Sequence, residues 1–395
     1  MLTFLLALAL SPGDSVPRPS AAAAPPAVVV HRQPALPIVA LRLSLAADDP
    51  PGFAGAGHLI QHLHLPALEE RVARVGGRVQ AVRTSDAVVY TVVGPAAELD
   101  YLAQTLLAAL RAPRPQEAER LRALNALAQE RGAEREIAAS YVRAALRARL
   151  FPDDLPATGS DAAAALLVDA PLDRVWAGMY DPARLNVVAV GDVELADVQR
   201  AFRAVPERSD AAASEEADTV RAYAVDQPQA TRAWIGRAWS AGDEDAAALT
   251  VTARLLRNRL RRSMTRSAVD VEHWWTHHGQ AMALVVATPD TLLPVARRTV
   301  AGALATLRDN LDERLVRDAA AAVRRDLLFY ARTPERMAEV LGAFADRGGQ
   351  PDDAQRFFAA LGRVTEEDVR ALLEAMIAQE AAAIEVPPQR LDPGR

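Results

Sequence analysis

The chain repeats one order of predicted elements, and this repeat constrains its fold more than any other feature. In the first copy, residues 27–206, strands precede a helix, a hairpin, further helices and a final strand. The second copy, residues 222–390, follows the same order from a strand near 231–239 onward. An acidic stretch poor in large apolar residues, 207–221, is typical of a linker. Because 395 residues also exceed the usual size of a single core, we predict two domains related by internal duplication.

Each domain is predicted to be an α+β unit, in which helices pack on a mixed β-sheet. On the strand predicted over 38–47, large apolar residues alternate with small and polar ones, so we expect one buried and one partly exposed face. The apolar positions are Val39, Leu41, Leu43 and Leu45, and the alternate positions are Ala40, Arg42 and Ser44. Further along, the pattern predicts a helix over 57–75, a hairpin over 76–94, a helix over 96–110 and one long or broken helix over 114–151.

Composition excludes several classes of function. The chain contains no cysteine, which excludes a disulfide framework, an iron–sulfur cluster and a thiolate nucleophile. Its net charge of -6 is interspersed along the chain, which argues against binding to nucleic acid or to an anionic membrane.

The first 26 residues resemble a secretory signal followed by a lead rich in proline and alanine. The apolar run 1–10 precedes small residues suited to cleavage around Ala21 to Ala24, although no basic residue precedes the run. We therefore expect export, to the periplasm or the medium. The run is too short to span a bilayer, and no later apolar stretch reaches spanning length.

Two histidines, His58 and His62, stand four residues apart on the helix predicted over 57–75. This spacing places both on one helical face, from which their ring nitrogens can reach a single ion. Zinc then requires a third protein ligand from another element. The pair alone is also compatible with ordinary surface or core histidines. His64 lies off this face.

The surroundings of the pair resemble the amino-terminal domain of the pitrilysin/insulinase family of zinc metallopeptidases. That family carries an inverted His-x-x-Glu-His motif, followed by a glycine pair and a strand with Asn-Ala. The matching downstream positions are Gly76, Gly77, Ala81, Thr84, Asp86 and Tyr90, with Gln80 in place of the Asn. The resemblance extends over residues 30 to 390. It implies a pitrilysin fold, as in mitochondrial processing peptidase, with two domains in a clam-like arrangement.

The resemblance also implies a ligand set and a peptide site. Zinc would be held by His58, His62 and Glu130, where Glu130 is placed by counting back from Phe151 and is chosen over Glu134 and Glu136. Helical phase does not decide this choice, because Glu130 and Glu134 share a face. The residues beside a bound peptide would be Gly77, Gln80 and Ala81.

Two positions depart from the family's catalytic pattern. Gln61 replaces the glutamate that serves as general base, and an amide orients water but takes no proton from it. In the second half the family places an Arg and a Tyr at the scissile carbonyl. Arg262 would supply the cation, but Val269 stands where the Tyr is expected.

A second group of histidines, His273, His277 and His278, resembles a metal cluster. Strand alternation places neighbours on opposite faces, and Trp274 and Trp275 favour a packed hairpin instead.

Three functional hypotheses follow. The first is an exported pseudo-peptidase, zinc-binding or metal-free, which binds extended peptides by β-augmentation or completes a homologous partner chain or homodimer. The second is an active zinc endopeptidase in which Glu69, Glu70 or a partner residue replaces the base. The third is a purely structural subunit without metal.

Overall fold

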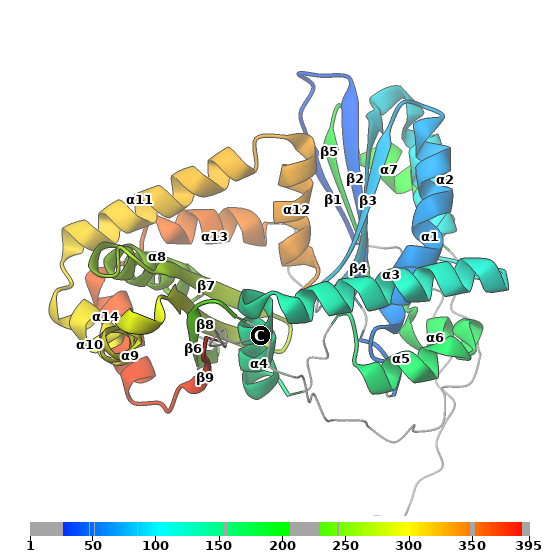
Figure 1. Ribbon diagram of the computed structural model, residues 1–395. Coiled ribbons are helices and arrows are strands. Elements are labelled where there is room, and N and C mark those ends of the chain that lie inside the picture. The colour runs from blue at the N-terminus through cyan, green and yellow to red at the C-terminus, as the bar shows by residue number, and fades with distance from the viewer. Residues whose placement is uncertain are drawn as a thin grey trace, which may run out of the picture.

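The chain folds into two α+β domains (Figure 1). The computed structural model describes residues 27–46, 48–50, 52–84, 86–152, 157–205, 230–242, 245–347 and 352–388. The predicted signal segment, 1–26, and the predicted linker, 207–221, lie outside the described residues.

The first sheet contains five strands in the order β1-β5-β2-β4-β3. Their bounds are β1 Ala27–Arg32, β2 Ile38–Ala46, β3 Arg78–Arg83, β4 Ala87–Pro95 and β5 Leu185–Gly191. β1 runs parallel to β5, and the remaining pairs are antiparallel. Among the described strands β3 pairs with β4 alone, so one of its sides is a free edge of this sheet.

The helices of the first domain are α1 Ala56–Ala73, α2 Leu99–Ala108, α3 Glu117–Glu136, α4 Ala138–Leu150, α5 Asp161–Val168, α6 Leu172–Met179 and α7 Leu195–Ala201, with short 3-10 turns at Ala96–Glu98 and Pro182–Arg184. Of these, α1, α2 and α7 pack on the first sheet. The apolar side chains of β2, including Leu41 and Leu43, are buried in the core beneath α1 and α2. Burial of such side chains is the main favourable contribution to the stability of this layer.

The second sheet contains four antiparallel strands in the order β7-β8-β6-β9. They are β6 Ala233–Gly242, β7 Ala268–Thr276, β8 Gly279–Thr288 and β9 Ala382–Val386. The helices of this domain are α8 Ala246–Ser263, α9 Leu293–Ala301, α10 Ala303–Asp309, α11 Glu313–Tyr330, α12 Pro334–Ala345, α13 Asp353–Leu361 and α14 Glu366–Ile377, with a 3-10 turn at Asp290–Leu292. α8, α10, α11 and α14 contribute buried residues to the core of this domain.

Strand order confirms the predicted duplication. The order β5-β2-β4-β3 in the first sheet corresponds to β9-β6-β8-β7 in the second, and in both copies the long helix, α1 or α8, precedes the hairpin. The α+β class with two homologous domains is therefore correct, and β1 is an addition to the first copy.

Each domain also lends one helix to the other. The long helical stretch predicted to end at Phe151 breaks at Ile137, whose extended backbone (ψ 102°) redirects the chain from α3 into α4. α4 then packs on the second sheet through Val142 and Leu146. In return, α12 packs on the first sheet beside β2 and β5 (Figure 1).

This exchange overturns one expectation. The second face of the strand predicted over 38–47 is not partly exposed, because α12 covers it: Ala40 and Ser44 are fully buried and Arg42 is 4% exposed. The guanidinium of Arg42 donates to both carboxylate oxygens of Asp346, directly after α12, and Ser44 donates to the same carboxylate.

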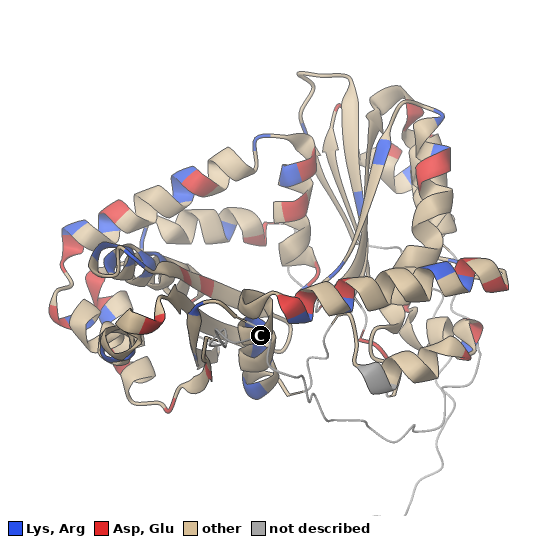
Figure 2. Ribbon diagram, in the orientation of Figure 1, with Lys and Arg blue, Asp and Glu red and all other residues tan. Residues whose placement is uncertain are grey.

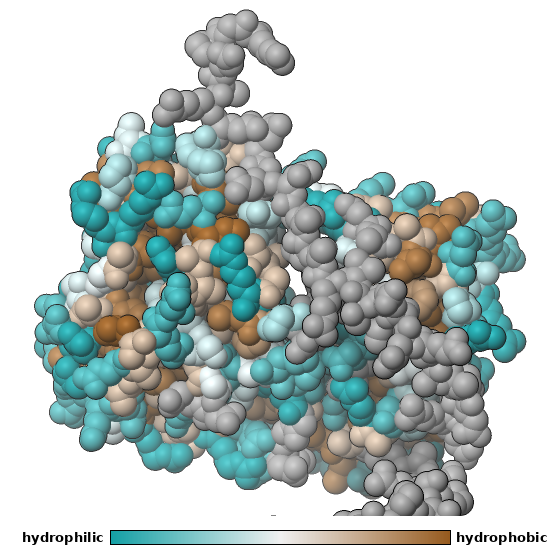
Figure 3. All heavy atoms as spheres, turned by 90° about the horizontal axis from the view of Figure 1, so that it is seen from below, coloured by the Kyte–Doolittle hydropathy of each residue, from teal (hydrophilic) through white to brown (hydrophobic). Residues whose placement is uncertain are grey.

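The surface carries charges of both signs on the helices of both domains (Figure 2). The part of the lower face visible in Figure 3 mixes hydrophilic and hydrophobic residues. Within the described residues, no helix combines the length and the apolar character needed to cross a bilayer.

Candidate metal centre

The first turn of α1 is fixed by a carboxylate. Asp49 accepts hydrogen bonds from the backbone N–H groups of Gly55 (2.7 Å) and Gly57 (2.9 Å), which satisfies amides that a helix start leaves without partners. Gly55 itself has φ 91°, a left-handed conformation that favours glycine.

This anchored turn places His58 and His62 one above the other. Their rings stack with centroids 4.8 Å apart and an interplanar angle of 14°. His58 is 8% exposed. Because burial penalises the charged ring, the pKa of His58 lies below its ordinary value, although Glu130 acts in the opposite direction. The imidazole is therefore neutral at physiological pH, which is the form that binds metal.

Glu130 comes from α3, which packs across α1. One of its carboxylate oxygens lies 3.1 Å from Nε2 of His58, and the other lies 3.3 Å from Nε2 of His62. One ligand atom from each of the three residues lies within 4.8 Å of the others. The structure thus brings together the three residues named as ligands, and Glu134 points elsewhere, accepting a hydrogen bond from Thr158 (2.8 Å).

The three side chains fit a zinc ion. Two ligands about 2.0–2.1 Å from a tetrahedral zinc lie roughly 3.3 Å apart, which matches both nitrogen–oxygen distances. Nε2 of His62 is buried, and among the described residues it has no hydrogen-bond partner, although Glu130 lies 3.3 Å away. Two imidazoles and one carboxylate also form a common donor set for catalytic zinc, with room for a fourth ligand.

Gln61 lies between this cluster and the edge strand. It is 5% exposed, and its Nε2 donates to the backbone carbonyl of Ala81 (3.0 Å). Its Oε1 is buried without a hydrogen-bond partner among the described residues. An unpaired buried oxygen costs free energy unless a water or another donor meets it, so this atom is free to accept a hydrogen bond from a bound group.

The backbone of Ala81 faces the free edge of the sheet. The amide of Thr84 bonds to Ala87, so Thr84 belongs to a hydrogen-bonded pair of the β3–β4 ladder. Hydrogen-bonded and non-hydrogen-bonded pairs alternate along an antiparallel ladder, so Gln80 belongs to a hydrogen-bonded pair and Ala81, opposite Tyr90, to a non-hydrogen-bonded pair. The N–H and C=O of Ala81 therefore point away from β4, toward the free edge. Sequence reasoning missed the Gln61–Ala81 contact, because no local pattern indicates it.

The other two positions named beside a peptide lie on the same edge. Gly77 precedes β3, where a Cβ atom would come within 2.7 Å of the carbonyl oxygen of Val93, so only glycine fits there without a shift. The side chain of Gln80 is exposed on β3.

The residues named in the second domain do not join this centre. Arg262 is exposed in the last turn of α8, and among the described residues no contact joins it to the histidine pair. Val269 is buried on β7. Neither Glu69 nor Glu70 reaches the site, since both are exposed on α1 about 12 Å along the axis from Gln61, and Glu70 pairs with Arg74.

His64 and His273 have hydrogen-bond partners within their own domains. His64 lies off the ligand face as expected and contacts the hydroxyl of Tyr90 (3.0 Å) and the carbonyl of Arg111 (3.1 Å). His273 contacts Thr250 (2.8 Å) and Gln280 (2.9 Å) and stacks on Trp275, apart from His277 and His278.

The burial of His273 leads to a prediction about acid stability. Burial lowers its pKa to about 4, below the unfolded value near 6.5. The unfolded chain therefore takes up a proton that the folded chain does not, so stability present above pH 6.5 is lost as the pH falls toward 4, by about 3 kcal/mol in total. Urea unfolding between pH 7 and 4 should show a weaker pH dependence in His273→Gln than in the wild type. Equal slopes in both proteins would contradict this assignment.

Comparison with solved structures decides the fold. A peptidase M16 inactive domain from Pseudomonas fluorescens superposes with a TM-score of 0.75 at 15% identity, over 93% of this chain and 97% of that one. The fold is that of the M16 peptidases. A protease from Helicobacter pylori also superposes on this chain, with a TM-score of 0.73 at 13% identity, over 91% of this chain and 97% of that one. A protein from Alicyclobacillus acidocaldarius described as an M16-like peptidase superposes with a TM-score of 0.72 at 15% identity, over 92% and 96% of the two chains.

The sequence comparisons gave no further relative: no family model and no curated protein matches the chain. In this chain α1, which carries the histidine pair, contacts the edge strand β3 through the Gln61–Ala81 hydrogen bond. Since the identities are low, the structural likeness establishes the fold, and the chemistry is argued from the site itself.

Proposed function

We propose that this protein is a catalytically degenerate M16-like peptidase that holds a zinc ion and binds extended peptides along the free edge of β3. The observation that supports the proposal most directly is the position of Gln61, which lies on the same helix as the histidine pair and contacts the edge strand. Its amide donates to Ala81 on the edge strand, while the adjacent cluster retains all three donor side chains.

Zinc binding rests on His58, His62 and Glu130. Zinc in such a site acts as a Lewis acid toward a carbonyl or a water. The chain's own residues supply a neutral imidazole at His58 and a carboxylate that reaches both rings. What the site lacks is an acid at position 61 to take a proton from an attacking water and return it to the leaving amine.

Peptide binding rests on the free edge of β3. Main-chain hydrogen bonds to an exposed strand edge provide affinity without strict sequence preference. Ala81 presents its N–H and C=O to that edge, and Gln61 occupies the C=O. An incoming strand would therefore pair with the N–H of Ala81 and displace or share the amide of Gln61.

Partnering and export complete the proposal. M16-like chains with two such domains commonly act as pairs that enclose a peptide, so we propose that the peptide is held against a homologous partner chain or a second copy of this chain. Export to the periplasm or the medium is proposed from residues 1–26 alone.

An active zinc endopeptidase is the alternative function. The separation of Glu69 and Glu70 from Gln61 along α1 argues against either as the substitute base. The alternative then requires an acid from a partner chain. A metal-free structural subunit is the third possibility, and a zinc measurement separates it from the first two.

The proposal is tested by paired variants at each half of the site. Glu130→Ala should lose stoichiometric zinc in metal analysis, whereas Glu134→Ala, which alters a neighbouring carboxylate bonded to Thr158, should retain it. Ala81→Pro removes the outward N–H without breaking the ladder to β4, and should weaken binding of fluorescently labelled unfolded casein roughly tenfold. Ala81→Gly keeps the N–H and should bind as the wild type does. Equal zinc in the two glutamate variants, or equal casein affinity in Ala81→Pro and Ala81→Gly, would refute the corresponding half.

A further inference from the structure

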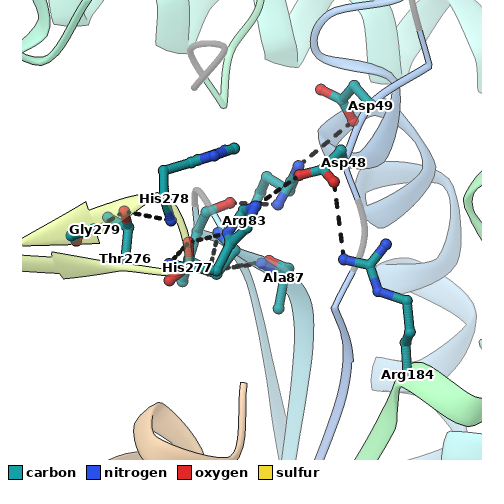
Figure 4. Close-up of polar contacts among 11 residues, drawn as sticks. Asp48, Asp49, Arg83, Ala87, Arg184, Thr276, His277, His278 and Gly279 are labelled. Carbon is teal, nitrogen blue, oxygen red and sulfur yellow. Dashed lines mark hydrogen bonds and ion pairs between the residues drawn. The ribbon is translucent and has the colours of Figure 1, made fainter. Parts of the chain in front are cut away.

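The turn between β7 and β8 carries two histidines that reach the first domain. His277 and His278 stand at the tip of the hairpin and face the segment that holds Asp48 and Asp49 (Figure 4). Nδ1 of His277 lies 2.7 Å from Oδ1 of Asp86, and the backbone N–H of His277 donates to the same oxygen at 3.2 Å. The Asp86 side chain is 10% exposed, so this contact is a buried anchor between the domains.

The other nitrogen of His277 points at a second carboxylate. Nε2 lies 3.3 Å from Oδ1 of Asp48, while the other oxygen of Asp48 faces Arg184 at 3.8 Å. The ring of His278 lies against that of His277, with centroids 3.8 Å apart. One ligand atom each from Asp48, His277 and His278 lies within 4.8 Å of the other two.

We propose that these three residues form a second zinc site, which joins the two domains. The donor set of two imidazoles and one carboxylate suits zinc. The distance between Nε2 of His277 and Oδ1 of Asp48 matches the roughly 3.3 Å between two ligands of a tetrahedral zinc. The side chains of Asp48 and His277 are 57% and 26% exposed, so the site is open to an ion from solution.

Asp86 gives this cluster the outer partner that protein zinc sites usually contain. A histidine that ligates through one nitrogen generally donates its other N–H to a carboxylate, which fixes the tautomer and the ring orientation. Asp86 accepts from Nδ1 of His277 and so leaves the lone pair on Nε2 directed toward Asp48.

A plain ion pair accounts for less of the geometry. A protonated His277 between Asp48 and Asp86 would explain two of the contacts, but it leaves His278 unexplained. Among the described residues, the exposed side chain of His278 has no hydrogen bond or ion pair, and its ring packs beside that of His277. A metal ion gives both rings a common partner.

A zinc ion at this second site would link the second domain to the metal centre of His58, His62 and Glu130. Asp48 precedes Asp49, which caps the first turn of α1 directly before His58. A zinc ion held by Asp48 and the hairpin would tie the second domain to the segment that positions the histidine pair.

The test uses zinc alone and a chain in which the first centre is removed. In the background of His58→Ala with His62→Ala, calorimetric titration with Zn²⁺ should show one ion bound per chain. His278→Ala should weaken that binding at least tenfold. Asp86→Asn should weaken it by about 10- to 100-fold, the usual cost of losing an outer partner. His31→Ala, a histidine on β1 outside both clusters, should leave it unchanged.

Thermal unfolding provides the second readout. Because the ligands come from both domains, Zn²⁺ should raise the Tm of the background variant, and it should not raise that of its His278→Ala derivative. A background variant that binds no zinc, or one whose affinity is unaffected by His278→Ala, overturns the proposal. His278 is exposed, so its replacement is compatible with folding, and an unchanged circular dichroism spectrum verifies this.

Discussion

Gln61→Glu should raise zinc-dependent peptide cleavage by about 10²- to 10⁴-fold over the wild type, the usual contribution of a positioned general acid–base. The substitution changes one atom of the side chain and keeps its shape. A carboxylate cannot donate to the carbonyl of Ala81, so it loses the contact that the amide makes at 3.0 Å. Repelled by that carbonyl, it turns toward the cluster of His58, His62 and Glu130, where a water would be activated.

The gain has a ceiling set by the second domain. Val269, at the position where the family resemblance implies a Tyr, is buried on β7, and valine has no side-chain donor to offer a scissile carbonyl. The removal of a single such donor costs about 10²–10³ in kcat elsewhere. Peptide cleavage by Gln61→Glu should therefore be measurable, but slower than cleavage by a peptidase that has both the glutamate and the tyrosine.

Two control variants test whether the gain requires a carboxylate at position 61 and an intact metal centre. Gln129→Glu makes the same amide-to-acid change at an exposed position on α3 next to Glu130, and should leave cleavage at the wild-type level. Adding Glu130→Ala to Gln61→Glu should abolish the gained activity together with zinc. Cleavage is measured with a quenched fluorescent peptide. Wild-type cleavage as fast as that of Gln61→Glu would mean that the pseudo-peptidase proposal is wrong.

Local periodicity was enough to predict most of the secondary structure. The helix predicted over 57–75 is α1, the hairpin over 76–94 is β3 and β4, and the strands of the second copy are present in the predicted order. These elements were predictable because the apolar residues repeat at the period of the element that buries them. The duplication was predictable for the same reason, since the order of elements survives when sequence identity does not.

The reverse face of β2 shows where local reasoning fails. A strand that reads Ala40, Arg42, Ser44 on one side is ordinarily half exposed, since an arginine is rarely buried without a partner. Its partner, Asp346, lies more than 300 residues later in sequence, and α12 covers the face only because the two copies exchange helices. No pattern within the strand carries that information.

The metal centre was predictable only in part. The spacing of His58 and His62 indicates a shared face, but helical phase left Glu130 and Glu134 equivalent. The choice of Glu130 came from the family resemblance, and the structure shows its physical basis: α3 crosses α1 so that Glu130 reaches both rings while Glu134 bonds to Thr158. In the second domain the sequence drew attention to His277 and His278 but grouped them with His273, and nothing in it indicated Asp48, because that residue comes from the other domain.

Asp346→Ala should destabilise the protein by about 3–5 kcal/mol, the usual cost of leaving a buried charge without its partner. The side chains of Arg42 and Asp346 are 5% and 6% exposed. Two parallel hydrogen bonds join them, and Ser44 completes the carboxylate's contacts. Gly342 on α12 makes room for the guanidinium, since a Cβ atom there would collide with it. Removing the carboxylate leaves the guanidinium buried beneath α12 without its charged partner, where water has little access.

Urea unfolding, followed by both tryptophan fluorescence and circular dichroism, measures this loss and tests whether the two domains unfold together. Asp197→Ala is the matched control. It removes an exposed ion pair with Arg200 at 2.6 Å, and such pairs contribute about 0–1 kcal/mol. Replacing both partners, as Arg42→Met with Asp346→Leu, should recover most of the stability, because no charge then remains buried. A loss below about 1 kcal/mol in Asp346→Ala would show that α12 leaves the first sheet readily, and that the exchanged helices do not hold the domains together.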